Sequence, residues 1–116
     1  MNITPSQSRM HNGVHDFRAT QVCCLDLSGL KNKAAVLAAL GTGLGLPAHY
    51  GGNFDALADC LMDGDWARAD SITIVLSGSA NAARGLKADW QTLIEVFEES
   101  CAWWAERGKA FQVILC

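Results

Sequence analysis

Apolar and polar positions along the chain form stretches of two kinds, one typical of buried strands and one of helices. Short, continuously apolar runs predict strands over residues 22–27, 71–76 and 111–115. Apolar residues at three- and four-residue steps predict helices over residues 31–40, 54–62 and 88–106, with a short turn of helix over 81–85. Fully apolar strands separated by helices are typical of a parallel sheet covered by helices. The pattern therefore predicts an α/β fold with a three-stranded parallel sheet packed by helices.

Glycine, proline and asparagine mark the expected ends of the helices around the centre of the chain. Gly41, Gly43 and Gly45 follow the first helical stretch, and we expect them to end it. After a loop, Asn53 stands directly before the second helical stretch. Asparagine at such a position commonly accepts a hydrogen bond from a free N–H group of the first helical turn. We therefore expect Asn53 to be the N-cap of the helix over 54–62.

Length and composition indicate one globular domain with an N-terminal extension. The 116 residues suit a single domain, and half of them are apolar. Charged residues make up 18%, which does not fit intrinsic disorder of the whole chain. Residues 1–20 show no apolar periodicity. The expected organisation is a disordered extension over 1–20 and a domain over 21–116.

Charge and apolar run length argue against two classes of partner. The net charge is −3, and nucleic-acid binding needs clustered Lys and Arg instead. No run approaches the apolar length of a membrane span, and residues 1–20 lack the apolar stretch of a signal peptide. The five cysteines show no disulfide-framework spacing, which favours a reducing compartment. We expect a cytoplasmic protein that binds neither nucleic acid nor membrane and is a monomer when free.

No motif for catalysis or cofactor binding is present. The run from Gly41 to Gly45 follows a predicted helix, whereas a dinucleotide-binding glycine run follows a strand. Cys23 and Cys24 are neighbours in a predicted strand, so their side chains point to opposite faces and suit core packing better than one metal ion. His49 has no nucleophile at a recognisable spacing. We expect no cofactor, no metal and no enzyme activity.

Acidic residues recur once per turn along the second predicted helix. Asp55, Asp59 and Asp63 are spaced i, i+4, i+8, and like charges at this spacing oppose the helix by about 0.2–0.5 kcal/mol per pair. Three interpretations are open. The row is a solvated helix face, an acid/base pair for hydrolysis, or a face that docks a basic partner. The flanking aromatics Tyr50 and Trp66 add weight to docking, because aromatic residues are common at binding hot spots.

The segment around these carboxylates resembles a known family. The residues Tyr50-Gly51-x-Asn53-x-Asp55-Ala56-Leu57-x-Asp59-Cys60-Leu61 combine a loop, a helix cap and a helix at fixed spacing. This run is similar to the central segment of the barstar family, which are intracellular inhibitors of guanyl-preferring ribonucleases. The order of elements from about residue 21 to the last residue also agrees with that family. The resemblance implies a three-stranded parallel sheet packed by helices, and a protein that is an inhibitor or antitoxin and not an enzyme.

The resemblance also implies which residues contact the partner. Asp59 would occupy the phosphate-binding part of the ribonuclease active site, and Asp55 would pair with a neighbouring base. Their carboxylates can accept charge-assisted hydrogen bonds in place of a substrate phosphate. The resemblance further implies supporting contacts from Tyr50, His49 and Glu99. It assigns Gly51 and Asn53 to shaping the loop and the helix cap.

The chain departs from the family pattern at three positions of this surface. Ala58 stands where the family has a tryptophan, His49 where it has a tyrosine, and Gly52 where it has an acidic residue. These smaller side chains predict less contact area with a ribonuclease. The leading expectation is one-to-one binding of a barnase-like ribonuclease, and the alternative is a barstar-fold module that binds a non-nuclease protein.

Overall fold

Three parallel strands form the centre of the sheet, and a short antiparallel strand adds a fourth at one edge. The computed structural model describes residues 2–3, 20–47, 50–64, 66 and 70–116. The parallel strands are β2 (Thr20–Asp26), β3 (Ser71–Ser77) and β4 (Ala110–Leu115), and β1 (Asn2–Ile3) pairs antiparallel with β4. The strand order is β1-β4-β3-β2, so β3 lies between the other two parallel strands.

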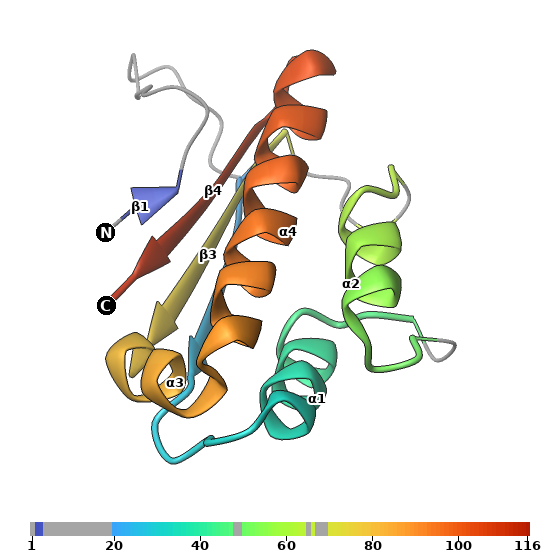
Figure 1. The fold of residues 1–116 in the computed structure, drawn as a ribbon. Coiled ribbons are helices and arrows are strands. Elements are labelled where there is room, and N and C mark those ends of the chain that lie inside the picture. The colour runs from blue at the N-terminus through green and yellow to red at the C-terminus, as the bar shows by residue number, and fades with distance from the viewer. Residues whose placement is uncertain (1, 4–19, 48–49, 65, 67–69) are drawn as a thin grey trace.

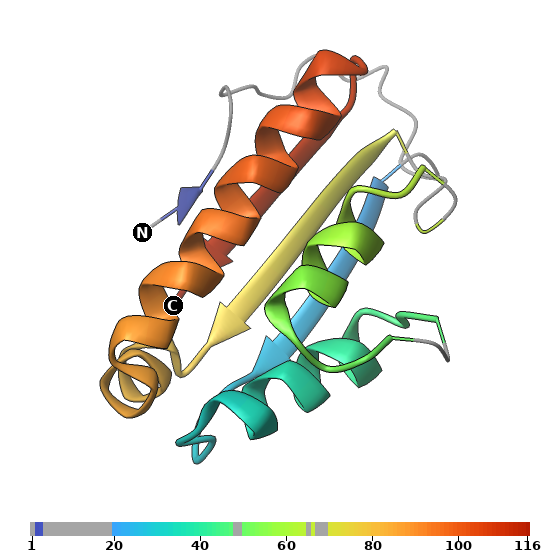
Figure 2. The ribbon, with the colours of Figure 1, turned by 45° about the vertical axis from the view of Figure 1, so that its right-hand side comes forward.

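Within the described residues, four helices accompany the sheet: α1 (Lys33–Gly43), α2 (Phe54–Leu61), α3 (Ser79–Leu86) and α4 (Ala88–Glu106). Figures 1 and 2 show α1, α2 and α4 on the same side of the sheet, with α4 along β3 and β4 and α2 beside it. The short helix α3 follows β3 directly and leads into α4. In this arrangement α2 has one face toward the core and one face toward solvent.

The hydrophobic core lies between the sheet and this layer of helices. Every second residue of β3 is fully buried, namely Ile72, Ile74 and Leu76, because alternate side chains of a strand point to the same face. The longest helix contributes the large side chains Phe97 and Trp104, which are also almost fully buried. Burial of such side chains supplies most of the driving force for folding.

The fold class predicted from the sequence is confirmed, and several element bounds differ from the prediction. Strand β2 begins at Thr20 and not at residue 22, and helix α1 begins at Lys33 and not at residue 31. The helix α1 does not end at Gly41 but continues to Gly43. The predicted turn over 81–85 is a full helix of eight residues, α3. The strand β1 lies inside the stretch expected to be disordered, although most of residues 1–20 lie outside the described part of the chain.

The face of the sheet opposite the helices remains partly open among the described residues. Val22 on the edge strand β2 is 59% exposed, and Cys24 on the same face is exposed as well. Cys23 points to the helical side and packs against the core. The predicted division of the two cysteines between opposite faces is therefore correct, whereas the prediction of core packing fails for Cys24.

One residue between α3 and α4 has a backbone conformation that normally requires glycine. Lys87 has φ 55° and ψ −120°, and it is the only non-glycine residue with positive φ in the described part of the chain. Such a conformation costs an L-residue about 1–3 kcal/mol. We expect Lys87→Gly to raise the free energy of unfolding by up to about 1 kcal/mol, because it relieves this backbone strain. The gain is smaller than the full strain, because glycine also has more freedom in the unfolded chain. Urea denaturation measures the change, and Lys87→Ala, which keeps the strained conformation, should give no such gain.

Candidate functional site

The helix α2 is short and relies on a side-chain cap and on one apolar face. The side-chain oxygen of Asn53 accepts a hydrogen bond from the backbone N–H of Ala56 at 2.7 Å, so the predicted N-cap is present. Leu57 and Leu61 are fully buried against the core. Asp55 lies in the first turn, where the positive end of the helix dipole stabilises a carboxylate.

Two carboxylates stand on the outer face of α2. Asp55 and Asp59 are both exposed and lie one helical turn apart. Among the described residues no Lys or Arg forms an ion pair with either of them. Asp63, one turn further along the chain, is exposed beyond the end of the helix. Asp55 and Asp59 are therefore two exposed negative charges without an ion-pair partner in the described part of the chain, and a cation from outside can reach them.

The loop before α2 is held against α1 by the ring of Tyr50. The Tyr50 hydroxyl donates a hydrogen bond to the backbone carbonyl of Leu37 at 3.0 Å. A Cβ atom at Gly41 would lie 2.7 Å from the Tyr50 ring, which is too close for any side chain. The glycine therefore does not end the helix, as the sequence suggested, but makes room in it for the tyrosine.

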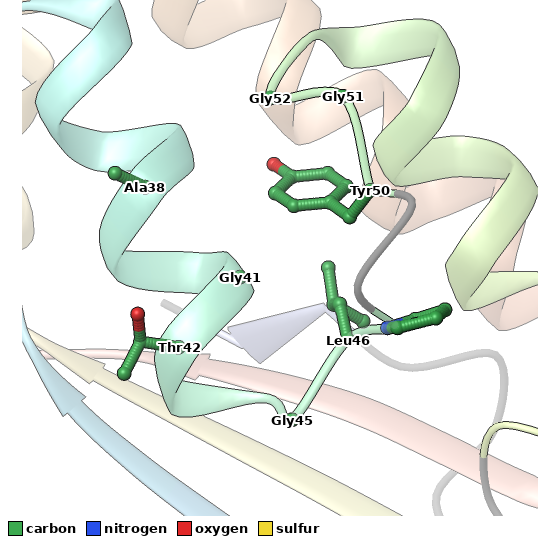
Figure 3. A pocket seen from close by; sticks show the side chains of 9 residues that line it. Ala38, Gly41, Thr42, Gly45, Leu46, Tyr50, Gly51 and Gly52 are labelled. Atoms are coloured by element: carbon green, nitrogen blue, oxygen red, sulfur yellow. The ribbon is translucent and has the colours of Figure 1, made fainter.

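A shallow hollow separates α1 from this loop. It measures about 550 Å³ and is open to one side. Figure 3 shows Ala38, Gly41 and Thr42 of α1 on one side, Tyr50 with Gly51 and Gly52 on the other, and Leu46 below. None of the described residues that line it carries a charge. The hollow adjoins the loop that the sequence resemblance assigns to the partner surface.

Two tryptophan side chains fix the segments on either side of the loop and the helix. The indole N–H of Trp104 donates to the carbonyl of Leu61, the last residue of α2, at 2.8 Å. The indole N–H of Trp66 donates to the carbonyl of Leu44, just after α1, at 2.9 Å. Trp104 is one of the apolar residues whose three- and four-residue spacing predicted the helix over 88–106. The two bonds depend on tertiary contacts, and only the apolar spacing of Trp104 gave a signal for its burial.

The structure brings together part of the predicted partner-contacting residues. Asp55 and Asp59 share the outer face of α2, with Asn53 and the exposed Gly51 at its start. Glu99 is exposed on α4, the helix that packs beside α2. His49 lies outside the described residues.

The thiols of Cys60 on α2 and Cys101 on α4 are not activated as nucleophiles. Burial raises the pKa of the Cys60 thiol, and the negative charges of Asp59 and Asp63 raise it further. Burial, together with the charge of Glu98, raises the pKa of Cys101 to about 12. Both thiols therefore stay protonated at neutral pH, whereas nucleophilic cysteines need a lowered pKa. Within the described ranges, no three His, Cys, Asp or Glu side chains are grouped as metal ligands, and no helix has the length and apolar character to cross a bilayer.

The hydrogen bond of Tyr50 makes a pH-dependent contribution to stability. Partial burial raises the pKa of the Tyr50 phenol, and Cys60 adds to the shift. Because the folded pKa lies above the unfolded value, the contribution is complete below pH of about 10 and is lost as the pH rises through the folded pKa. We expect Tyr50→Phe to lower the free energy of unfolding by about 0.5–1.5 kcal/mol at pH 7. Urea denaturation should show this difference shrinking above pH of about 10, and a constant difference would contradict the assignment.

Fold and site together define a small α/β protein that exposes an acidic helix next to a hollow whose described lining residues carry no charge. The family model described as barstar, the barnase inhibitor, matches residues 20–116 of this chain. The chain therefore belongs to the barstar family. A comparison with curated proteins finds no matching sequence.

Proposed function

We propose that this protein inhibits a barnase-like ribonuclease by binding it one-to-one and covering its active site with α2 and the loop before it. Membership of the barstar family supports a role as a ribonuclease inhibitor and not as an enzyme. The observation that carries the assignment to α2 is the pair of exposed carboxylates, Asp55 and Asp59, without a cation partner in the described part of the chain.

The chemistry of a ribonuclease active site fits this surface. Such a site binds phosphodiesters with cationic side chains, and a carboxylate can accept the same charge-assisted hydrogen bonds as a phosphate oxygen. Asp59 is the proposed central anchor and Asp55 the second. Opposite charges on the two proteins also speed their association.

The remaining residues have supporting roles in the proposal. Tyr50 and Gly51 hold and shape the loop, and Asn53 caps the helix that carries the carboxylates. His49 precedes this loop and would add a contact at its edge. Glu99 on α4 would add a negative charge near the rim of the interface.

The proposal includes the setting in which the protein acts. An inhibitor of this kind protects the cell that makes the ribonuclease, so we place it in the cytoplasm as an antitoxin that is a monomer before it binds. The domain proposed to perform this function is the one expected over residues 21–116, together with Thr20, at which strand β2 begins. The residues before Thr20 take no part in the proposed contact surface.

Titration calorimetry against basic, barnase-type ribonucleases, and against any ribonuclease encoded beside this protein, tests the proposal. We expect one-to-one binding and loss of ribonuclease activity in proportion to the inhibitor added. The double variant Asp55→Lys and Asp59→Lys, which reverses the charge of α2, should abolish both. If no ribonuclease binds, while a lysate pull-down that depends on the same two aspartates yields a non-nuclease protein, the proposal is wrong and the chain is a barstar-fold module for another partner.

A further inference from the structure

A second cavity lies away from α2, at the end of the sheet where strands β2 and β3 finish. It measures about 470 Å³. It is lined by residues of the loop after β2 and of helix α3, namely Gly29, Lys31, Asn81, Arg84 and Gly85. In open parallel sheets, ligands commonly bind outside the carboxyl ends of the strands. None of the lining residues belongs to the proposed ribonuclease-binding surface.

Close packing of two backbones places two positive charges at this cavity. A Cβ atom at Gly85 would lie 2.7 Å from the backbone oxygen of Lys31, so α3 rests directly on the loop after β2. Arg84 precedes this glycine in α3 and also lines the cavity, as does Lys31. The two cations thus reach the same cavity from segments far apart in the sequence.

The described residues provide no carboxylate to balance these charges. Neither Lys31 nor Arg84 forms an ion pair with a described Asp or Glu. The nearest acidic residues along the chain are Asp26, five positions before Lys31, and Asp89, five positions after Arg84, and Asp89 does not line the cavity. The carboxylate of Asp26 accepts hydrogen bonds from the backbone N–H of Ser28 and the hydroxyl of Ser77. Asp26 does not line the cavity. An anion in the cavity would therefore meet two cations and no opposing carboxylate among the lining residues.

Hydrogen-bond donors are arranged around the same space. The guanidinium of Arg84 donates to the side-chain oxygen of Asn81, which orients both side chains. The amide NH2 group of Asn81 and further N–H groups of Arg84 have no hydrogen-bond partner among the described residues. A planar guanidinium, an ammonium group and an amide donor that line one cavity suit the oxygen atoms of a phosphate.

We propose that this cavity binds a phosphate group, either as inorganic phosphate or as a small phosphomonoester. A phosphate carries a charge of about −1.5 to −2 at neutral pH, which matches Lys31 and Arg84 together. The cavity volume is within the range of small-molecule sites. The described lining residues include no aromatic ring and no large apolar side chain on which a nucleobase could stack, so the lining favours a small phosphate compound over a nucleotide.

Titration of the full chain, followed by the NMR shifts of its backbone amides, tests the proposal. The probes are sodium phosphate and sodium glycerol 3-phosphate, with sodium chloride at matched ionic strength as the reference. We expect saturable shifts centred on Gly29, Lys31 and Gly85 with both probes. Tighter binding of glycerol 3-phosphate would identify a phosphomonoester site, and equal or weaker binding would identify a site for inorganic phosphate.

Two double variants, each of which removes two positive charges, distinguish specific binding of phosphate at the cavity from nonspecific electrostatic attraction to the protein surface. The variant Lys31→Gln with Arg84→Gln should weaken phosphate binding by about tenfold or more, since it removes two charged donors. The control Arg107→Gln with Lys109→Gln removes two cations at the far end of α4 and should leave the affinity within about twofold. Shifts that do not saturate, that spread over all surface cations, or that weaken equally in both variants would overturn the proposal.

Discussion

Replacing Asp59 by alanine is expected to weaken binding of the ribonuclease by about 2–5 kcal/mol. This is the general range for removing one partner of a buried charge pair at an interface, and measurements on the barnase–barstar complex are among those that define it. This corresponds to an increase in the dissociation constant of about 30-fold to several thousand-fold. The physical reason is that the cations of the active site, stripped of water by the complex, would lose their central counter-charge. Because Asp59 is exposed in the free protein, its removal should not disturb the fold.

A matched control separates this effect from the loss of one negative charge. Glu95 is an exposed carboxylate on α4, and Glu95→Ala removes one negative charge, as Asp59→Ala does. We expect Glu95→Ala to change the association rate by less than about threefold and the dissociation rate hardly at all. Stopped-flow kinetics together with calorimetry measure both. Tight inhibition that survives Asp59→Ala would refute the assigned contact surface while leaving the inhibitor role in place.

Replacing Trp104 by phenylalanine is expected to be the most damaging conservative change to the fold, at about 2–4 kcal/mol. The indole is 1% exposed, and its N–H bonds the carbonyl at the end of α2. Phenylalanine leaves a cavity and a buried carbonyl of Leu61 without its donor. Urea denaturation measures the loss, and hydrogen exchange should show faster opening of α2 than of the strands.

The neighbouring Trp103 provides the control for this change. It is partly exposed, stacks edge-on against Trp104 at 4.9 Å between ring centroids, and lies under the guanidinium of Arg107. Trp103→Phe keeps an aromatic ring at a position where no indole hydrogen bond is lost, so we expect a cost of less than about 1 kcal/mol. Equal losses for the two variants would mean that the Trp104 hydrogen bond does not hold α2.

The pattern of apolar residues was sufficient to predict the main helices and strands, because burial on one face dictates where those residues occur. Helix α4 begins and ends where the spacing predicted, and the cap at Asn53 follows from local chemistry alone. The extent of α1 was not predictable, because Gly41 is tolerated in that helix only on account of the ring of Tyr50 from a later loop. Strand β1 has two residues and depends on the free edge of β4, which no local pattern reveals.

For the candidate site too, the sequence could predict features that depend on local spacing but not those that depend on tertiary contacts. The spacing of Asp55 and Asp59 fixed their common helix face in advance. The bond from Trp104 to the end of α2, by contrast, joins residues 43 positions apart and requires the packed tertiary structure. The convergence of Lys31 and Arg84 on one cavity likewise depends on close contact between α3 and a distant loop.

The two faces of α2 are independent of each other, and this has a consequence for how the family diversifies. Its buried residues, Leu57 and Leu61, hold the helix to the core, while Asp55 and Asp59 contribute nothing to that attachment. Mutations on the outer face can therefore accumulate without endangering folding. Under the proposed function, the recognition residues on the outer face could therefore be exchanged for those that suit a different ribonuclease, while the buried residues that hold the helix stay the same.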